Sequence, residues 1–173
     1  MVSTLDRIFL DFSARKLQES ASQIRTCLGK LNEEQVWSRG GEEENAIGNL
    51  VLHLCGNVRQ WIVSGVGGAP DIRDRDAEFA ACGGSSIAAL GERLRGVVAE
   101  AAAALAAVTP ERLAERVVIQ KYDLPVLEAI YHVVEHFSLH TGQIIFATKM
   151  LTGSDLGLYA HLRTAAAHGK KTP

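Results

Sequence analysis

Histidine spacing is the feature of this sequence that most clearly suggests chemistry. Three of the six histidines, His132, His136 and His140, follow one another at intervals of four residues. In an α-helix each such step advances about 6 Å and turns about 40° beyond a full turn, so the three side chains lie along one inclined stripe. Two imidazoles at i and i+4 can bind one metal ion, but the outer two are about 12 Å apart along the axis. Two candidate pairs remain, His132 with His136 and His136 with His140.

The residues around this stripe indicate that it faces the protein interior. They are apolar, namely Val133, Phe137 and Ile144. A single histidine there would usually be a hydrogen-bonded core residue, but three in register favour a metal site, since a buried imidazole without a partner costs free energy. His53, in a second apolar segment, can supply a third nitrogen. Three neutral imidazoles suit zinc, nickel, cobalt, copper or iron and leave a coordination position open, as in catalytic zinc sites.

Two other metal-binding motifs fit the sequence less well than this set. The run from His132 to His136 matches the inverted zinc-peptidase pattern, with Glu135 as general base. The pattern is short, and a chain of 173 residues has little room for the further acidic ligand and large cleft that such peptidases need. The Glu-x-x-His signature of di-iron bundles occurs at none of the histidines. We therefore favour the three-histidine set over both.

The helices that carry these side chains can be predicted from the spacing of apolar residues. Apolar residues recur at steps of three and four over residues 5–31, 47–62, 87–108 and 127–150, which predicts four amphipathic helices. Residues 65–84, rich in glycine and charge, read as a long non-helical crossover. Residues 115–122 are β-prone and short, as in an extended connector or a small hairpin. The predicted fold class is all-α: an up-down-down-up-type four-helix bundle with one long crossover, forming a single domain over residues 1–173.

Capping residues mark the expected helix boundaries. Asn32 precedes two glutamates and is a candidate N-cap, and Ser85 or Ser86 can cap the third long helix. Gly153 can end the fourth, and Ser154 with Asp155 can begin a short extra C-terminal helix.

Composition narrows the classes of partner. The net charge of −2 and the aromatic fraction of 6% give no basis for nucleic-acid binding. The N-terminal residues do not resemble a signal peptide, and no apolar run is long enough for a bilayer. The three cysteines Cys27, Cys55 and Cys82 form no Cys-x-x-Cys pair, which fits a reducing compartment. We expect a cytoplasmic protein without a membrane or nucleic-acid partner.

Three runs of this sequence resemble the DinB/YfiT-like superfamily. The run from His136 to Gln143, with its His-x-x-x-His before a Gly-Gln pair, looks like the superfamily's fourth-helix signature. The run from Asn49 to Asn57, centred on His53, looks like its second-helix signature. Residues 70–79 resemble a loop of one bacterial branch.

The resemblance implies a ligand set and a chemistry. It implies a four-helix bundle with a short fifth helix and one divalent metal ion held by His53, His136 and His140. Zinc and nickel are the first candidates for that ion, and iron, manganese and cobalt the others. His132 would then be a pocket residue. The resemblance also implies a homodimer and a low-molecular-weight thiol as cosubstrate, since relatives include thiol-dependent transferases and isomerases.

The predicted function is a metal-dependent transferase or isomerase that acts on a small molecule. The alternatives are a non-catalytic metal-binding stress or scaffold dimer and a metal-dependent hydrolase. No catalytic residue is assigned. The residues expected to orient groups around the metal are Asn49, Asn57, Glu135 and Gln143. An anionic substrate could be held by Arg59, Arg73 and Arg75, although a solvated face with salt bridges explains these arginines at least as well.

Overall fold

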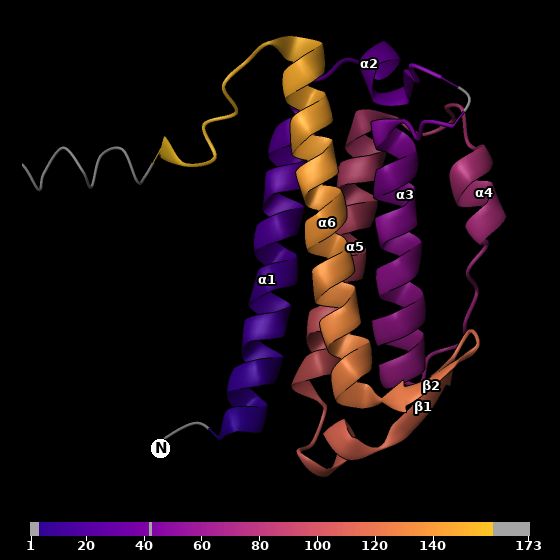
Figure 1. Cartoon of the computed structure of the whole chain (residues 1–173), viewed down its shortest axis with the longest axis vertical. Helices are drawn as coiled ribbons and strands as arrows, with labels where there is room; N and C mark the ends of the chain where they lie inside the picture. The colour runs from indigo at the N-terminus through magenta and orange to yellow at the C-terminus, as the bar shows by residue number, and fades with distance from the viewer. Residues whose placement is uncertain (1–3, 42, 161–173) are drawn as a thin grey trace, which may run out of the picture.

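Four long helices lie side by side and form most of the protein (Figure 1). The computed structural model describes residues 4–41 and 43–160. In chain order the elements are α1 (Leu5–Leu28), α2 (Glu33–Trp37), α3 (Ile47–Val58), the π-helical η1 (Arg59–Val66), α4 (Arg75–Ala80), α5 (Ile87–Ala106), the 3₁₀ turn η2 (Glu111–Ala114), β1 (Arg116–Ile119), β2 (Tyr122–Pro125) and α6 (Val126–Thr152). The all-α class predicted from the sequence is confirmed.

The ends of the helices meet at two poles of the bundle. At one pole the Arg7 side chain of α1 donates to the carbonyl of Ala106, the last residue of α5, at 3.3 Å. At the other pole the Gln35 amide of α2 donates to the carbonyl of Leu151 in α6, at 3.3 Å. α1 and α6 therefore run in one direction and α3 and α5 in the other, as Figure 1 shows.

The core lies where the apolar faces of the four helices meet. α1, α3, α5 and α6 each contribute side chains that are almost completely inaccessible, including Leu17, Leu54, Leu94 and Phe137. Each such side chain contributes roughly 1.5–3 kcal/mol when it leaves water. This burial fixes the rotation of α3 and α6 about their own axes, and so fixes where their histidines lie.

The predicted caps are present at most boundaries. Asn32 accepts from the Gln35 N–H while the Gln35 side chain accepts from the Asn32 N–H, which is a capping box. The Ser86 hydroxyl caps α5. Gly153 ends α6 with φ of 62°, a left-handed conformation that glycine adopts without strain.

The crossover differs from the prediction, because residues 65–84 are not wholly non-helical. η1 extends to Val66, and Arg75–Ala80 form the short helix α4. Asp74 starts α4 by accepting from the Ala77 N–H at 3.0 Å. The glycine and charge content of this segment did not predict α4, which packs against the side of α3.

The β-prone stretch and the C-terminal segment differ in how well the sequence predicted them. Residues 116–125 form the antiparallel hairpin β1–β2, which confirms one of the two predicted alternatives for this stretch. Residues 153–159 are not helical, so the extra C-terminal helix does not begin at Ser154. His161 and His168, expected to be exposed, lie outside the described residues. Within the described part, no helix combines the length and apolarity needed to cross a membrane.

Asn49 fastens the crossover to the start of α3. Its buried side-chain amide donates to the carbonyls of Glu78 at 2.9 Å and Ala81 at 2.7 Å. Its carbonyl accepts from the Ala46 N–H and from Arg39. One side chain thus satisfies several backbone groups and sets the position of α4 beside α3.

Replacing Asn49 tests this attachment. We expect Asn49→Ala to lower the free energy of unfolding by about 2–3 kcal/mol, because buried partners lose their hydrogen bonds. Urea denaturation measures the change. The control is Asn45→Ala, at an exposed asparagine four residues earlier, which should change it by under about 0.5 kcal/mol. Equal effects of the two substitutions would refute the role of Asn49.

Candidate metal centre

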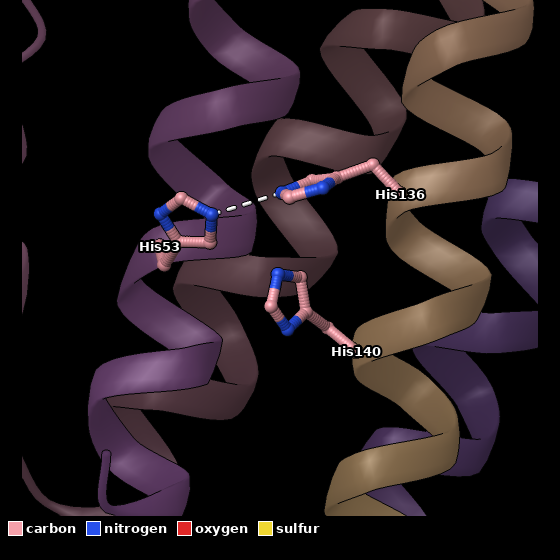
Figure 2. Close-up of side chains that lie close together, drawn as sticks. All are labelled: His53, His136 and His140. Carbon is pink, nitrogen blue, oxygen red and sulfur yellow. Dashed lines mark hydrogen bonds between the residues drawn. The ribbon is translucent and has the colours of Figure 1, made fainter. Parts of the chain in front are cut away.

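Three histidines from two helices converge between α3 and α6. His53 extends from α3, and His136 and His140 extend from successive turns of α6 (Figure 2). Each offers one ring nitrogen, and these three atoms all lie within 4.8 Å of one another. The Nε2 atoms of His53 and His136 are 2.9 Å apart.

The donor set and its spacing fit a divalent metal ion. Two imidazole nitrogens bound tetrahedrally to zinc at 2.0–2.1 Å would be about 3.3 Å apart. The 2.9 Å separation of the His53 and His136 Nε2 atoms is within a few tenths of an ångström of that value. Nitrogen donors alone suit zinc, nickel, cobalt, copper or iron and do not select one of them.

The outward-facing nitrogens of two of these rings have acceptors. His53 Nδ1 lies 3.2 Å from the Glu78 carboxylate and 3.1 Å from Arg73 Nη2, and His140 Nδ1 lies 2.6 Å from the Gln143 side-chain oxygen. If Nδ1 carries the proton in each ring, Nε2 presents a lone pair to the centre. A carboxylate or amide oxygen behind the ring is the usual arrangement for metal-binding histidines, since it fixes tautomer and orientation.

Glu78 is held in place by Arg73. Arg73 Nε donates to one Glu78 oxygen at 2.9 Å, and Nη2 donates to the other at 2.8 Å. Both side chains are almost fully buried, with 4% of Arg73 and 6% of Glu78 exposed. Gly56 makes room for this pair, because a Cβ at that position would lie 1.7 Å from the Glu78 carboxylate.

Glu78 was missed among the candidate site residues. It lies in α4, inside the segment predicted to be non-helical. The only signal was its place within residues 70–79, the run that resembles a loop of one branch of the superfamily. No spacing rule connects it to His53, because the contact depends on the path of the crossover.

The site favours uncharged imidazoles and a charged carboxylate. Burial, together with the charges of the neighbouring His140, His53, His132 and Arg73, lowers the pKa of His136 to about 3. Burial also lowers the pKa of His140, against an opposing hydrogen bond with Gln143. For Glu78, burial acts to raise the pKa, but the hydrogen bonds from Arg73 and His53 outweigh it and the pKa is lowered. Neutral imidazoles are the form that binds metal.

The remaining α6 residues lie around the cluster in different ways. His132 is one turn from His136, with ring centroids 5.7 Å apart, and its ring lies 4.4 Å from that of Trp61. It is not one of the three histidines whose nitrogens converge. Glu135 is exposed and lies outside this set, which leaves the inverted-peptidase pattern without its expected geometry.

The other predicted residues have partners or positions away from the metal ligands. Asn49 binds backbone groups, as described above. Asn57 is buried, and its side-chain oxygen has no partner among the described residues. Arg59 pairs with Glu100, at 2.5 Å, and the Arg75 guanidinium lies 4.8 Å from the centre of the Phe79 ring.

Solved structures share this fold at low sequence identity. A conserved protein from Enterococcus faecalis superposes with a TM-score of 0.69 at 13% identity, over 83% of this chain and 97% of that one. A DinB-like protein from Bacillus cereus gives 0.65 at 15%, over 80% and 90%. A mutant of the mycothiol-dependent maleylpyruvate isomerase gives 0.56 at 12%, over 78% of this chain but 60% of the isomerase.

Sequence comparison gives the family. No curated protein matches the chain. Residues 4–162 match the family described as "Protein of unknown function (DUF1572)", which is DinB-like. The resemblance to the DinB/YfiT-like superfamily is thereby confirmed, and the chain belongs to the DUF1572 family of DinB-like proteins.

Proposed function

We propose that this protein binds one divalent metal ion through His53, His136 and His140 and acts as a metal-dependent transferase or isomerase on a small molecule. The observation that carries the proposal is the convergence of three imidazole nitrogens from two helices. Zinc and nickel are the first candidates for the ion. A low-molecular-weight thiol is the proposed cosubstrate, because one structural neighbour is named as a mycothiol-dependent isomerase.

The roles of the protein's own groups follow from the geometry. A divalent ion lowers the pKa of a thiol or water that binds it, so it supplies a nucleophile near neutral pH. Three protein ligands leave a position for that molecule. With the proton of each ring on Nδ1, Glu78 would accept from His53 and Gln143 from His140, and both Nε2 lone pairs would face inward. Asn57, one helical turn beyond His53, has a buried side-chain oxygen that accepts no hydrogen bond from the described residues.

The proposal extends to a cytoplasmic homodimer. The side of α6 away from the bundle carries exposed large apolar side chains, among them Tyr131, Leu139, Phe146 and Met150. Water-exposed apolar patches of this kind commonly mark protein interfaces.

Metal content of single variants tests the ligand set. We expect His53→Ala, His136→Ala and His140→Ala each to lose most of the bound metal, because two imidazoles hold a divalent ion much more weakly than three. Elemental analysis of protein purified without a histidine tag measures the metal-to-protein ratio. The matched control is His132→Ala, one turn along the same helix, which should keep its metal. Equal ratios in His132→Ala and His136→Ala would refute the ligand set.

An activity screen separates the enzyme from its alternatives. We expect metal-dependent conjugation of a thiol to members of an electrophile panel, reduced at least tenfold in His53→Ala. A hydrolase would instead turn over ester or amide substrates without added thiol. A scaffold would show neither activity and would keep its binding partner after the same substitution, an outcome that excludes the transferase and isomerase.

Acid should destabilise the metal-free protein through His136. Its pKa is about 3 in the folded state against an ordinary value of 6.5, so the unfolded chain binds a proton that the folded chain does not. The associated stability is fully present above pH 6.5 and is lost as the pH falls toward 3. We expect the free energy of unfolding of the metal-free protein to fall between pH 6.5 and 5, and to fall less in His136→Ala. Parallel curves for the two proteins would contradict this.

A further inference from the structure

A cavity of about 520 Å³ lies between α3, α5 and the crossover. This volume is in the range of sites for small molecules, roughly 300–1,000 Å³. Arg73 and Glu78 line it, and they are also the partners of His53, but His53 itself does not line it. The cavity is thus separate from the metal centre and shares one wall with it.

Two hydrogen-bond donors at this cavity lack acceptors. Arg93 is an exposed residue of α5 and forms no hydrogen bond or ion pair with any residue that the structure describes. The Nε atom of Arg59, on the opposite wall, is buried and has no partner within the described chain, although its Nη1 atom pairs with Glu100. Unused guanidinium donors beside a cavity favour a ligand that brings an acceptor, and a carboxylate is the natural match.

The acidic residues of the lining are already engaged. Both oxygens of Glu78 accept from Arg73, and one oxygen of Glu100 accepts from Arg59. One oxygen of Asp74 accepts from the Ala77 N–H and caps α4. The lining holds three arginines and three acidic residues, so its formal charges balance, but Arg93 is the one of these arginines that has no acceptor among the described residues.

The rest of the lining suits an aliphatic chain. Leu52, Ile72 and Val97 line the cavity with apolar side chains. Gly96 also lines it, and a Cβ at Gly96 would meet no atom within 4 Å, so the space above this residue is open.

We propose that this cavity binds a small organic carboxylate, with the carboxylate on Arg93 and Arg59 and its aliphatic part on Leu52, Ile72 and Val97. The ligand would also contact the wall formed by Arg73 and Glu78. Since that pair holds the Nδ1 side of His53, binding in the cavity and metal binding are coupled, and by linkage the coupling is reciprocal. The carboxylate site stands without a metal, whereas the coupling rests on the proposed function.

Titration of the whole metal-free protein with hexanoate tests the site. We expect saturable binding in the millimolar range, followed by shifts of backbone amide NMR signals in α3, α5 and the crossover. Hexylamine, which has a similar chain and the opposite charge, should not bind, and inorganic phosphate should bind more weakly than hexanoate. Binding of phosphate alone, or of hexylamine as well as hexanoate, would overturn the assignment of a carboxylate site.

Two pairs of variants locate the binding. Gly96→Met should weaken hexanoate binding at least tenfold by filling the cavity, whereas Gly91→Met, at an equally open glycine of the same helix, should not. Arg93→Gln should weaken it at least tenfold, whereas Arg95→Gln, at an exposed arginine paired with Glu92, should not. Equal effects within either pair would overturn the proposal.

A metal titration with and without saturating hexanoate tests the coupling. We expect the metal dissociation constant to change at least fivefold in the wild-type protein and to stay unchanged in Gly96→Met. An unchanged constant in the wild type would refute the coupling while leaving hexanoate binding intact. Failure of the wild type to bind metal at all would refute the proposed function alone, because the hexanoate titration uses metal-free protein.

Discussion

The buried ion pair between Arg73 and Glu78 is the interaction on which the arrangement of the site depends. Removing two charges from water is costly, and removing only one partner of such a pair typically destabilises a protein by about 3–5 kcal/mol. Here the cost is offset by two hydrogen bonds between the pair and by the His53 ring beside it. Both partners belong to the crossover, so their burial together beside His53 favours the path in which they pair and pack against α3.

Several features of the fold serve that constraint. Gly56 leaves the space that the Glu78 carboxylate occupies, and α4 supplies the helical turn that carries Glu78 toward α3. Asn49 holds the carbonyls at the end of that turn. All of these contacts involve the crossover. The crossover therefore determines how α3 presents His53.

The sequence could predict the parts of the site that depend on one helix at a time. The interval of four residues between His136 and His140 is a property of any α-helix, and apolar periodicity predicts which side of α6 is buried. His53 could be proposed as a third ligand from its place in a second apolar segment, but the choice of His140 over His132 needed the resemblance to a family, because the spacing fits both pairs. Glu78 could not be found from periodicity at all. Its contact with His53 spans 25 residues and depends on the short helix α4, which the glycine- and charge-rich sequence of the crossover did not predict.

The structure gives Arg73 a partner that the sequence did not predict. The sequence suggested arginines that hold an anionic substrate or pair with nearby aspartates. In the structure Arg73 pairs with a glutamate, and its Nη1 atom donates to Gln60 at 3.0 Å. The ion pair is buried rather than solvated, which a count of exposed charges cannot distinguish.

The three histidines are held with unequal firmness, and this bears on the choice of metal. His53 is fixed by a buried charged pair, whereas His140 bonds to Gln143, an exposed side chain on its own helix. His136 has no hydrogen bond from Nδ1 among the described residues. The α3 ligand is therefore held by more contacts than the two α6 ligands. Geometry is one of the factors that select among zinc, nickel and cobalt, and a centre in which two of three ligands have few orienting contacts restricts that geometry little. Availability of the metal in the cell would then weigh more than the shape of the site in deciding which ion is bound.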